Sequence, residues 1–101
     1  MSIKQLAETI ENRKNADTKS SWTAKLLASG PEKCAEKFGE EAVEAIIEAV
    51  KGNTDQLVKE AADAFYHLLV MCASRGVTLA DIEAELERRT AQSGLDEKAS
   101  R

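Results

Sequence analysis

The segment over residues 57–73 places the strongest constraint on how this chain can fold. Wound as an α-helix, it carries apolar side chains around most of its circumference. A helix of that kind is buried, so we expect it at the centre of a bundle. Yet Glu60, Asp63 and His67 share one stripe of it. Burying an uncompensated carboxylate costs several kcal/mol, so these acidic groups need a partner of opposite charge.

Helical periodicity and helix boundary signals also run through the rest of the chain. Aromatic residues make up only 4% of it, so the core must be built from Leu, Ile, Val and Ala, which favours helices over strands. Pro31 suits the first turn of a helix, Gly52 a helix end, and Thr78 a helix cap. We therefore expect five helices, over residues 3–13, 22–28, 31–51, 55–75 and 79–90.

These expectations describe an all-α fold of about five helices, arranged as an antiparallel helical bundle. A chain of 101 residues forms one domain. We place that domain at residues 1–91, followed by a flexible C-terminal tail over residues 92–101, where periodicity stops. Residues 57–73 carry more apolar surface than such a chain can cover. We therefore expect homodimerisation to complete the bundle.

The net charge of −4 restricts the classes of partner. It argues against nucleic acid, and an anionic phosphate substrate would need a cation as intermediary. Cys34 and Cys72 lie in apolar helical patterns without ligand spacing, so we expect reduced core thiols. The longest charge-free run, residues 64–74, is too short to cross a bilayer, and no signal peptide is evident. We expect a cytoplasmic protein that does not contact membranes.

A second acidic stripe lies on the helix expected over residues 31–51. Four glutamates crowd into about a quarter of its circumference: Glu40, Glu41, Glu44 and Glu48. Like charges four residues apart destabilise a helix by about 0.2–0.5 kcal/mol per pair. A solvated face, the alternative interpretation, would more often interleave lysines. We interpret this arc as one that attracts a cation.

The short connection after residue 51 predicts that this helix and the next pack antiparallel. Glu41 and Glu44 would then face Glu60 and Asp63, with the two members of each pair roughly 5–6 Å apart at Cβ. Oxygen ligands without His or Cys favour Mg²⁺, or Mn²⁺ as a substitute, over zinc. A buried salt bridge to Lys or Arg is the alternative for Glu60 and Asp63. We predict a Mg²⁺ site with these four carboxylates as ligands.

The two acidic motifs, residues 40–44 (EEAVE) and residues 60–63 (EAAD), resemble the signature of the all-α nucleotide pyrophosphohydrolases, which include MazG-like enzymes and dimeric dUTPases. Their surroundings resemble one family within it, the phosphoribosyl-ATP pyrophosphatases of histidine biosynthesis. The similar segments are residues 21–27 (SWTAKLL), 30–33 (GPEK), 37–41 (KFGEE) and 66–69 (YHLL). The likeness extends over residues 3–89. The chain departs from the family at Trp22, where Tyr is usual, and at Thr90, where His is frequent.

The resemblance implies hydrolysis of 1-(5-phosphoribosyl)-ATP between its α and β phosphates, which yields phosphoribosyl-AMP and pyrophosphate. It implies that Mg²⁺ neutralises the triphosphate, and it agrees with a homodimer whose active sites could share residues between chains. Glu40 is our candidate for the catalytic group that orients water or binds a second metal ion, and an exposed helix glutamate is the alternative. Lys25 and Lys33, with Lys37 in addition, are candidate contacts to the substrate phosphates, whereas lysines in general serve surface solubility.

Three further residues have less defined roles. We expect His67 to support the metal ligands from behind or to be a satisfied core histidine, without a catalytic role. Trp22 could stack on adenine or fill the core, and we expect the core. Arg75 could stabilise a helix end or reach a phosphate, and the sequence does not decide.

Two other functions fit parts of the pattern. A housekeeping pyrophosphohydrolase of noncanonical deoxynucleoside triphosphates would use the same carboxylates, and only the lysine segments favour the histidine pathway. A non-catalytic helical dimerisation module could offer the acidic stripe to a basic partner. That partner would require an exposed stripe, whereas Glu60 and Asp63 lie on a helix with a buried pattern.

Overall fold

The computed structural model describes residues 1–90, and the predicted tail over residues 92–101 lies outside them. The described part is all-α, without a strand, and its helices are α1 (Ile3–Asn12), α2 (Trp22–Ala28), α3 (Pro31–Lys51), α4 (Thr54–Ser74) and α5 (Leu79–Thr90). The five predicted helices are confirmed to within about one residue at either end. None of them combines the length and the apolar character that a membrane span requires.

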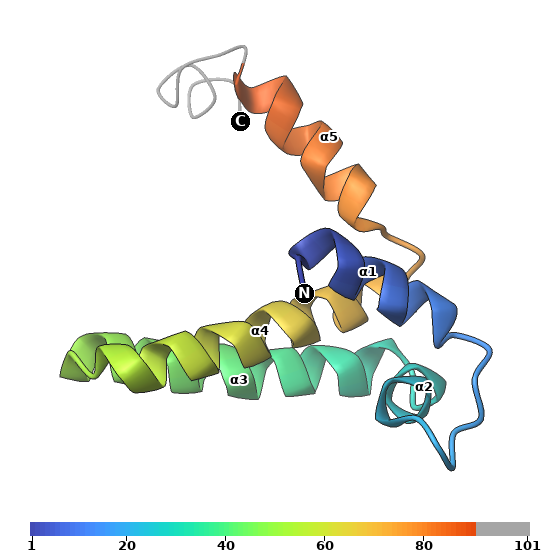
Figure 1. Cartoon of the computed structure of the whole chain (residues 1–101), viewed down its shortest axis with the longest axis horizontal. Coiled ribbons are helices and arrows are strands. Elements are labelled where there is room, and N and C mark those ends of the chain that lie inside the picture. The colour runs from blue at the N-terminus through green and yellow to red at the C-terminus, as the bar shows by residue number, and fades with distance from the viewer. Residues whose placement is uncertain (91–101) are drawn as a thin grey trace.

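Helices α3 and α4 form a long antiparallel hairpin, which is the longest feature of the molecule (Figure 1). Pro31 occupies the first turn of α3, where its missing N–H removes no helical hydrogen bond. Gly52 ends α3 with a φ of 78°, in the left-handed region that glycine adopts without strain. The Asn53 side chain then accepts a hydrogen bond from the backbone N–H of Gln56 and caps α4. Local chain chemistry thus sets the antiparallel arrangement.

The core lies at one end of this hairpin, where α1 and α2 pack against α4 and α3. Its buried side chains are Ile10, Leu26, Cys34, Leu69, Val70 and Ala73. The predicted reduced thiols are confirmed, since Cys34 and Cys72 are both free. Burial raises the pKa of each thiol above its ordinary value, so the neutral form is favoured.

Residues 1–90 do not bury α4 on every side, in agreement with the expectation that one chain cannot cover its apolar surface. Its second half is buried, but Val58 and Phe65 in the first half are 70% and 48% exposed. The reason is that α1 and α2 reach only one end of the hairpin, and α5 projects away from it after Leu79 (Figure 1). A large apolar surface on α3 and α4 is therefore left uncovered by residues 1–90.

Candidate active site

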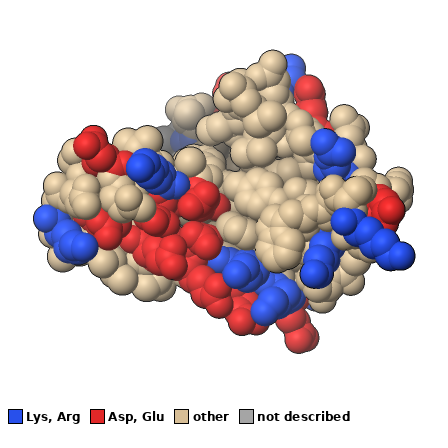
Figure 2. Space-filling view, turned by 60° about the horizontal axis from the view of Figure 1, so that its bottom comes forward, with Lys and Arg blue, Asp and Glu red and all other residues tan. Residues whose placement is uncertain are grey.

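Carboxylates from both helices of the hairpin meet on one of its faces. Glu41 of α3 and Glu60 and Asp63 of α4 each offer an oxygen atom, and these atoms lie within 4.8 Å of one another. Glu41 and Glu60 are half-buried, whereas Asp63 is exposed. Figure 2 shows acidic side chains as a continuous stripe, bordered directly by basic ones. The antiparallel packing predicted from the sequence therefore brings these three residues together.

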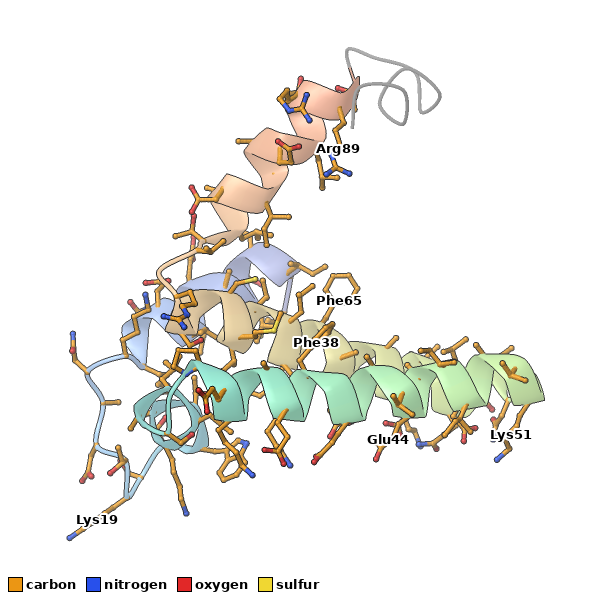
Figure 3. The ribbon with its side chains drawn as sticks, turned by 180° about the vertical axis from the view of Figure 1, so that it is seen from behind. Lys19, Phe38, Glu44, Lys51, Phe65 and Arg89 are labelled. Atoms are coloured by element: carbon orange, nitrogen blue, oxygen red, sulfur yellow. The ribbon has the colours of Figure 1, made fainter. Side chains whose placement is uncertain are left out.

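The fourth predicted ligand, Glu44, adjoins this group from α3. A hydrogen bond with the carboxyl group of Glu60 and the negative charge of Glu41 raise the pKa of Glu44. Two carboxylates that approach this closely repel each other unless a proton or a cation lies between them. The Glu44 side chain points away from the side of the hairpin on which Phe65 lies (Figure 3).

One oxygen of Glu60 shows that the acidic group lacks a positive partner. Oε1 accepts a hydrogen bond of 2.8 Å from Nε2 of Gln56, but Oε2 is buried and has no hydrogen-bond partner within residues 1–90. An unpaired buried carboxylate oxygen is costly. A hard divalent cation fits this set of oxygen donors, because Mg²⁺ prefers carboxylates and water to His or Cys ligands.

The candidate catalytic residue Glu40 lies outside the three-carboxylate group. Its carboxylate forms an ion pair with Lys37 at 3.3 Å, one helical turn earlier on α3, and its side chain is 50% exposed. Lys33, another candidate phosphate contact, pairs in the same way with Glu36 at 3.5 Å. Exposed ion pairs of this kind are weak, so a phosphate group could exchange for either carboxylate.

Trp22 corrects one expectation, because it does not fill the core. It is 56% exposed at the start of α2, and the Nζ atom of Lys25 lies 5.9 Å from the centre of its ring. The sequence could not decide this, because α2 is short and Leu26 and Ala24 fill its buried face. Lys25, the third candidate phosphate contact, is exposed and stands apart from Lys33 and Lys37 in having no carboxylate partner within residues 1–90.

His67 is buried, with 8% of its surface exposed, one turn beyond Asp63 on α4. Its ring packs edge-on against Tyr66, with 5.0 Å between the ring centres. Its Nδ1 atom has no hydrogen-bond partner in the described chain, and its role remains a prediction. Tyr66 in turn forms a hydrogen bond with Thr23 of α2, which joins the two helices.

Sequence reasoning missed one residue that positions the site, Gln56, and gave no role to another, Glu48. Gln56 holds Glu60 by a hydrogen bond, and a Gln four residues before a Glu on one helix is a recognisable signal for such a contact. Glu48 keeps a buried oxygen, Oε2, without a hydrogen bond in the described range, although Lys51 pairs with its other oxygen at 3.4 Å. The sequence placed Glu48 in the acidic arc but gave it no role.

Comparison with known proteins assigns the chain to a family. Residues 3–90 match the phosphoribosyl-ATP pyrophosphohydrolase family. The chain is 75% identical over 99 residues to the phosphoribosyl-ATP pyrophosphatase of Jannaschia sp. (strain CCS1), which covers 98% of this chain and 97% of the relative. It is 70% identical over 99 residues to the phosphoribosyl-ATP pyrophosphatase of Paracoccus denitrificans, and the match covers 98% of this chain and 92% of the relative. The chain with the acidic α3–α4 hairpin therefore belongs to the phosphoribosyl-ATP pyrophosphohydrolase family.

Proposed function

We infer that this chain hydrolyses 1-(5-phosphoribosyl)-ATP between the α and β phosphates. The products are phosphoribosyl-AMP and pyrophosphate, and the reaction belongs to histidine biosynthesis. The observation that carries the site assignment is that carboxylate oxygens of three residues lie within 4.8 Å of one another. One of these residues, Glu60, also has a buried oxygen without a hydrogen-bond partner in the described chain. Such a group suits a divalent cation and the phosphate chain that it would bind.

Mg²⁺ is the cation that this donor set favours, with Mn²⁺ as a substitute. Glu41, Glu60 and Asp63 would hold it, and Glu44, which adjoins Glu60 and Glu41, would join them as a fourth ligand. When bound, the ion would supply neutralising charge for the triphosphate and for the departing pyrophosphate. Gln56 keeps the Glu60 carboxylate oriented, because the hydrogen bond between them restricts rotation of the Glu60 side chain.

Lys37 and Glu40 are proposed to act as a coupled pair. A substrate phosphate that attracts Lys37 would release Glu40 from its ion pair. The freed carboxylate could then accept a hydrogen bond, and later the proton, from the attacking water. Lys33 would make the corresponding exchange from Glu36 to phosphate. In this mechanism substrate binding itself prepares the general base.

The uncovered apolar surface supports a homodimer. It includes Val43, Ile46, Ile47, Val50, Val58 and Phe65, all of which are exposed on the hairpin. Contiguous apolar patches of this kind on a small domain mark an interaction surface. A second copy of the chain is the partner that would extend the hairpin into a larger bundle.

The proposed function is tested by measuring pyrophosphate release from phosphoribosyl-ATP and from a panel of deoxynucleoside triphosphates, with Mg²⁺ or with EDTA. We expect turnover of phosphoribosyl-ATP that EDTA abolishes. Glu41→Gln and Glu44→Gln should each lower kcat by roughly 100-fold or more, because each removes a ligand charge. Glu8→Gln on α1 changes the net charge equally and should leave kcat unchanged.

Each other outcome has a defined meaning. Turnover of the deoxynucleoside triphosphates alone would move the chain to housekeeping chemistry with the same carboxylates. Full activity in EDTA would overturn the metal site. Full activity of Glu40→Gln would remove Glu40 from the mechanism. A folded protein that is inactive on every substrate would favour the non-catalytic binding module.

A further inference from the structure

A hollow of about 600 Å³ lies where the loop after α1 runs into α2. It is lined by the end of the connecting loop and the first turn of α2, namely Thr18, Lys19, Ser20, Ser21, Trp22 and Lys25. Trp22 is 56% exposed in it, an unusual amount for the largest apolar side chain. The hollow combines an aromatic ring, hydroxyl groups and ammonium groups, which is the chemistry that binds a base, a sugar and a phosphate.

Hydrogen bonds to Asp17 fix the loop that forms one wall of the hollow. Its side-chain Oδ1 accepts a hydrogen bond of 2.9 Å from the backbone N–H of Lys19. Its carbonyl oxygen accepts bonds of 3.1 and 3.0 Å from the backbone N–H groups of Ser20 and Ser21. This wall is therefore ordered before a ligand arrives, which reduces the entropic cost of binding.

The two lysines of the hollow differ from the other candidate phosphate contacts. Lys33 and Lys37 are already neutralised by glutamates, whereas Lys19 and Lys25 have no carboxylate partner within residues 1–90. Lys25 lies over one face of the Trp22 ring, at 5.9 Å. In a chain with a net charge of −4, two unpaired ammonium groups around one hollow create a local preference for an anion.

Helix α2 ties the hollow to the acidic group. Thr23, which follows Trp22, forms a hydrogen bond with the hydroxyl of Tyr66. Tyr66 lies three residues beyond Asp63 on α4, about 4.5 Å along the helix axis. The helix that forms part of the hollow therefore packs against the helix that carries Asp63.

Phosphoribosyl-ATP carries phosphate at two ends. The triphosphate is one end, and the phosphoribosyl group on N1 of the adenine is the other. The second end is all that distinguishes this substrate from ATP. A hydrolase that acts on phosphoribosyl-ATP in the presence of ATP must therefore recognise the phosphoribosyl group, and the acidic group with its cation cannot do so.

We propose that the hollow is the subsite for the phosphoribosyl group, in which Lys19 and Lys25 bind its 5′-phosphate and Trp22 supports the purine ring. The inference rests on the proposed function, because it assigns a part of that substrate. It separates the roles of the lysines: Lys33 and Lys37 serve the triphosphate, whereas Lys19 and Lys25 provide the selection against ATP.

Steady-state kinetics test the assignment of the lysines. Lys19→Ala and Lys25→Ala should each raise KM for phosphoribosyl-ATP about tenfold, the size expected for one charged hydrogen bond. Neither should change kcat or the inhibition constant of ATP by more than about twofold. Lys4→Ala on α1 removes the same charge outside the hollow and should leave all three constants unchanged.

Fluorescence tests the role of the ring, because Trp22 is the only tryptophan of the chain. In EDTA, where no turnover is expected, phosphoribosyl-ATP should quench its emission, and Lys19→Ala/Lys25→Ala should weaken that binding about 100-fold. Trp22→Phe should retain a low KM, whereas Trp22→Ala should raise KM without lowering kcat. Inhibition by pyrophosphate, which lacks both base and sugar, should be equal in all variants.

Three results would overturn the proposal. One is that the wild type hydrolyses phosphoribosyl-ATP and that Lys19→Ala and Lys25→Ala both show the same KM as the wild type. Another is an equal rise in KM and in the ATP inhibition constant, since the lysines would then bind the triphosphate. The third is emission that responds to dilution of the ligand-free protein but not to phosphoribosyl-ATP, which would place Trp22 at an interface between chains. Failure of the wild type to hydrolyse phosphoribosyl-ATP would instead refute the proposed function.

Discussion

Glu44 illustrates how a functional carboxylate can weaken the fold that carries it. The neighbouring carboxyl groups of Glu60 and Glu41 raise its pKa, so the folded chain disfavours its ionised form. A raised carboxyl pKa means that the folded chain loses stability as the pH rises through that pKa. With a cation bound, the ionised Glu44 carboxylate would stabilise the fold instead, because the cation attracts the carboxylates that otherwise repel one another.

From this we predict opposite effects of Glu44→Gln with and without Mg²⁺. In EDTA the substitution should raise Tm by a few degrees, because it removes like-charge repulsion. Addition of Mg²⁺ should raise the Tm of the wild type more than that of the variant. Thermal unfolding at pH 7 in both buffers measures this, with Glu8→Gln as a charge-matched control. An identical rise with Mg²⁺ in both proteins would remove Glu44 from the ligand set.

At the scale of single elements, one glycine within α3 and one directly after it make a matched pair for a stability test. Gly52 ends the helix with a φ of 78°, whereas Gly39 lies within the helix, and a Cβ atom at either would meet nothing within 4 Å. Gly52→Ala should therefore destabilise the chain by about 1 kcal/mol through backbone strain alone. Gly39→Ala should stabilise it by roughly 0.5–1 kcal/mol. Urea unfolding measures both changes. A lower free energy of unfolding for Gly39→Ala would indicate that the space beside Gly39 is needed for another contact.

Helix α5 should be the part of the fold most sensitive to acid. Its first turn depends on a reciprocal pair of hydrogen bonds between Thr78 and Asp81, at 2.9 and 3.1 Å. Further along, Arg88 and Arg89 lower the pKa of Glu85 to about 2, and the bonds from Thr78 lower that of Asp81. Because both folded pKa values lie below the unfolded ones, their stabilisation is present above about pH 4.5 and is lost as the pH falls towards 2.

Carbon chemical shifts of the backbone between pH 6 and pH 2 measure this loss of helix. We expect the shifts of α5 to move towards random-coil values before those of α1. Helix α1 is the internal control, since its cap uses Ser2 and Gln5, which do not titrate. Asp81→Asn should weaken the pH dependence of the α5 chemical shifts. Simultaneous loss of both helices would show that global unfolding, not these contacts, sets the acid limit.

The helices could be predicted closely because their boundaries depend on local chemistry. Pro31, Gly52 and Thr78 act within one turn of their own position, and that information is in the sequence. The acidic group was also predictable. Helical spacing places the carboxylates of each helix on one stripe, and the short connection between α3 and α4 brings the two stripes face to face. The exposure of Trp22 was not, because it depends on whether another element covers the ring.

At the scale of the whole molecule, the chain leaves much apolar surface uncovered. Periodicity showed a surplus of apolar residues on α4, but it could not show that only its second half is buried by this chain. Phe65 lies on the side of the hairpin opposite Glu44, so a partner there would leave the acidic stripe free (Figure 3). Covering an apolar surface contributes about 25 cal/mol for each Å² removed from water. A second copy would thus stabilise the hairpin without blocking the substrate.

We therefore predict that Phe65→Glu converts a homodimer into a monomer. A charge placed in an apolar interface costs several kcal/mol, which should raise the dissociation constant about 100-fold or more. Leu86→Glu, on the projecting α5 and 56% exposed, adds the same charge to an exposed apolar position outside the hairpin. It should leave the dimer intact if the hairpin forms the interface. Sedimentation velocity over a range of concentrations distinguishes these results, and the Tm of the wild type should rise with protein concentration. A wild-type monomer at all concentrations would mean that a second copy of the chain does not cover this surface.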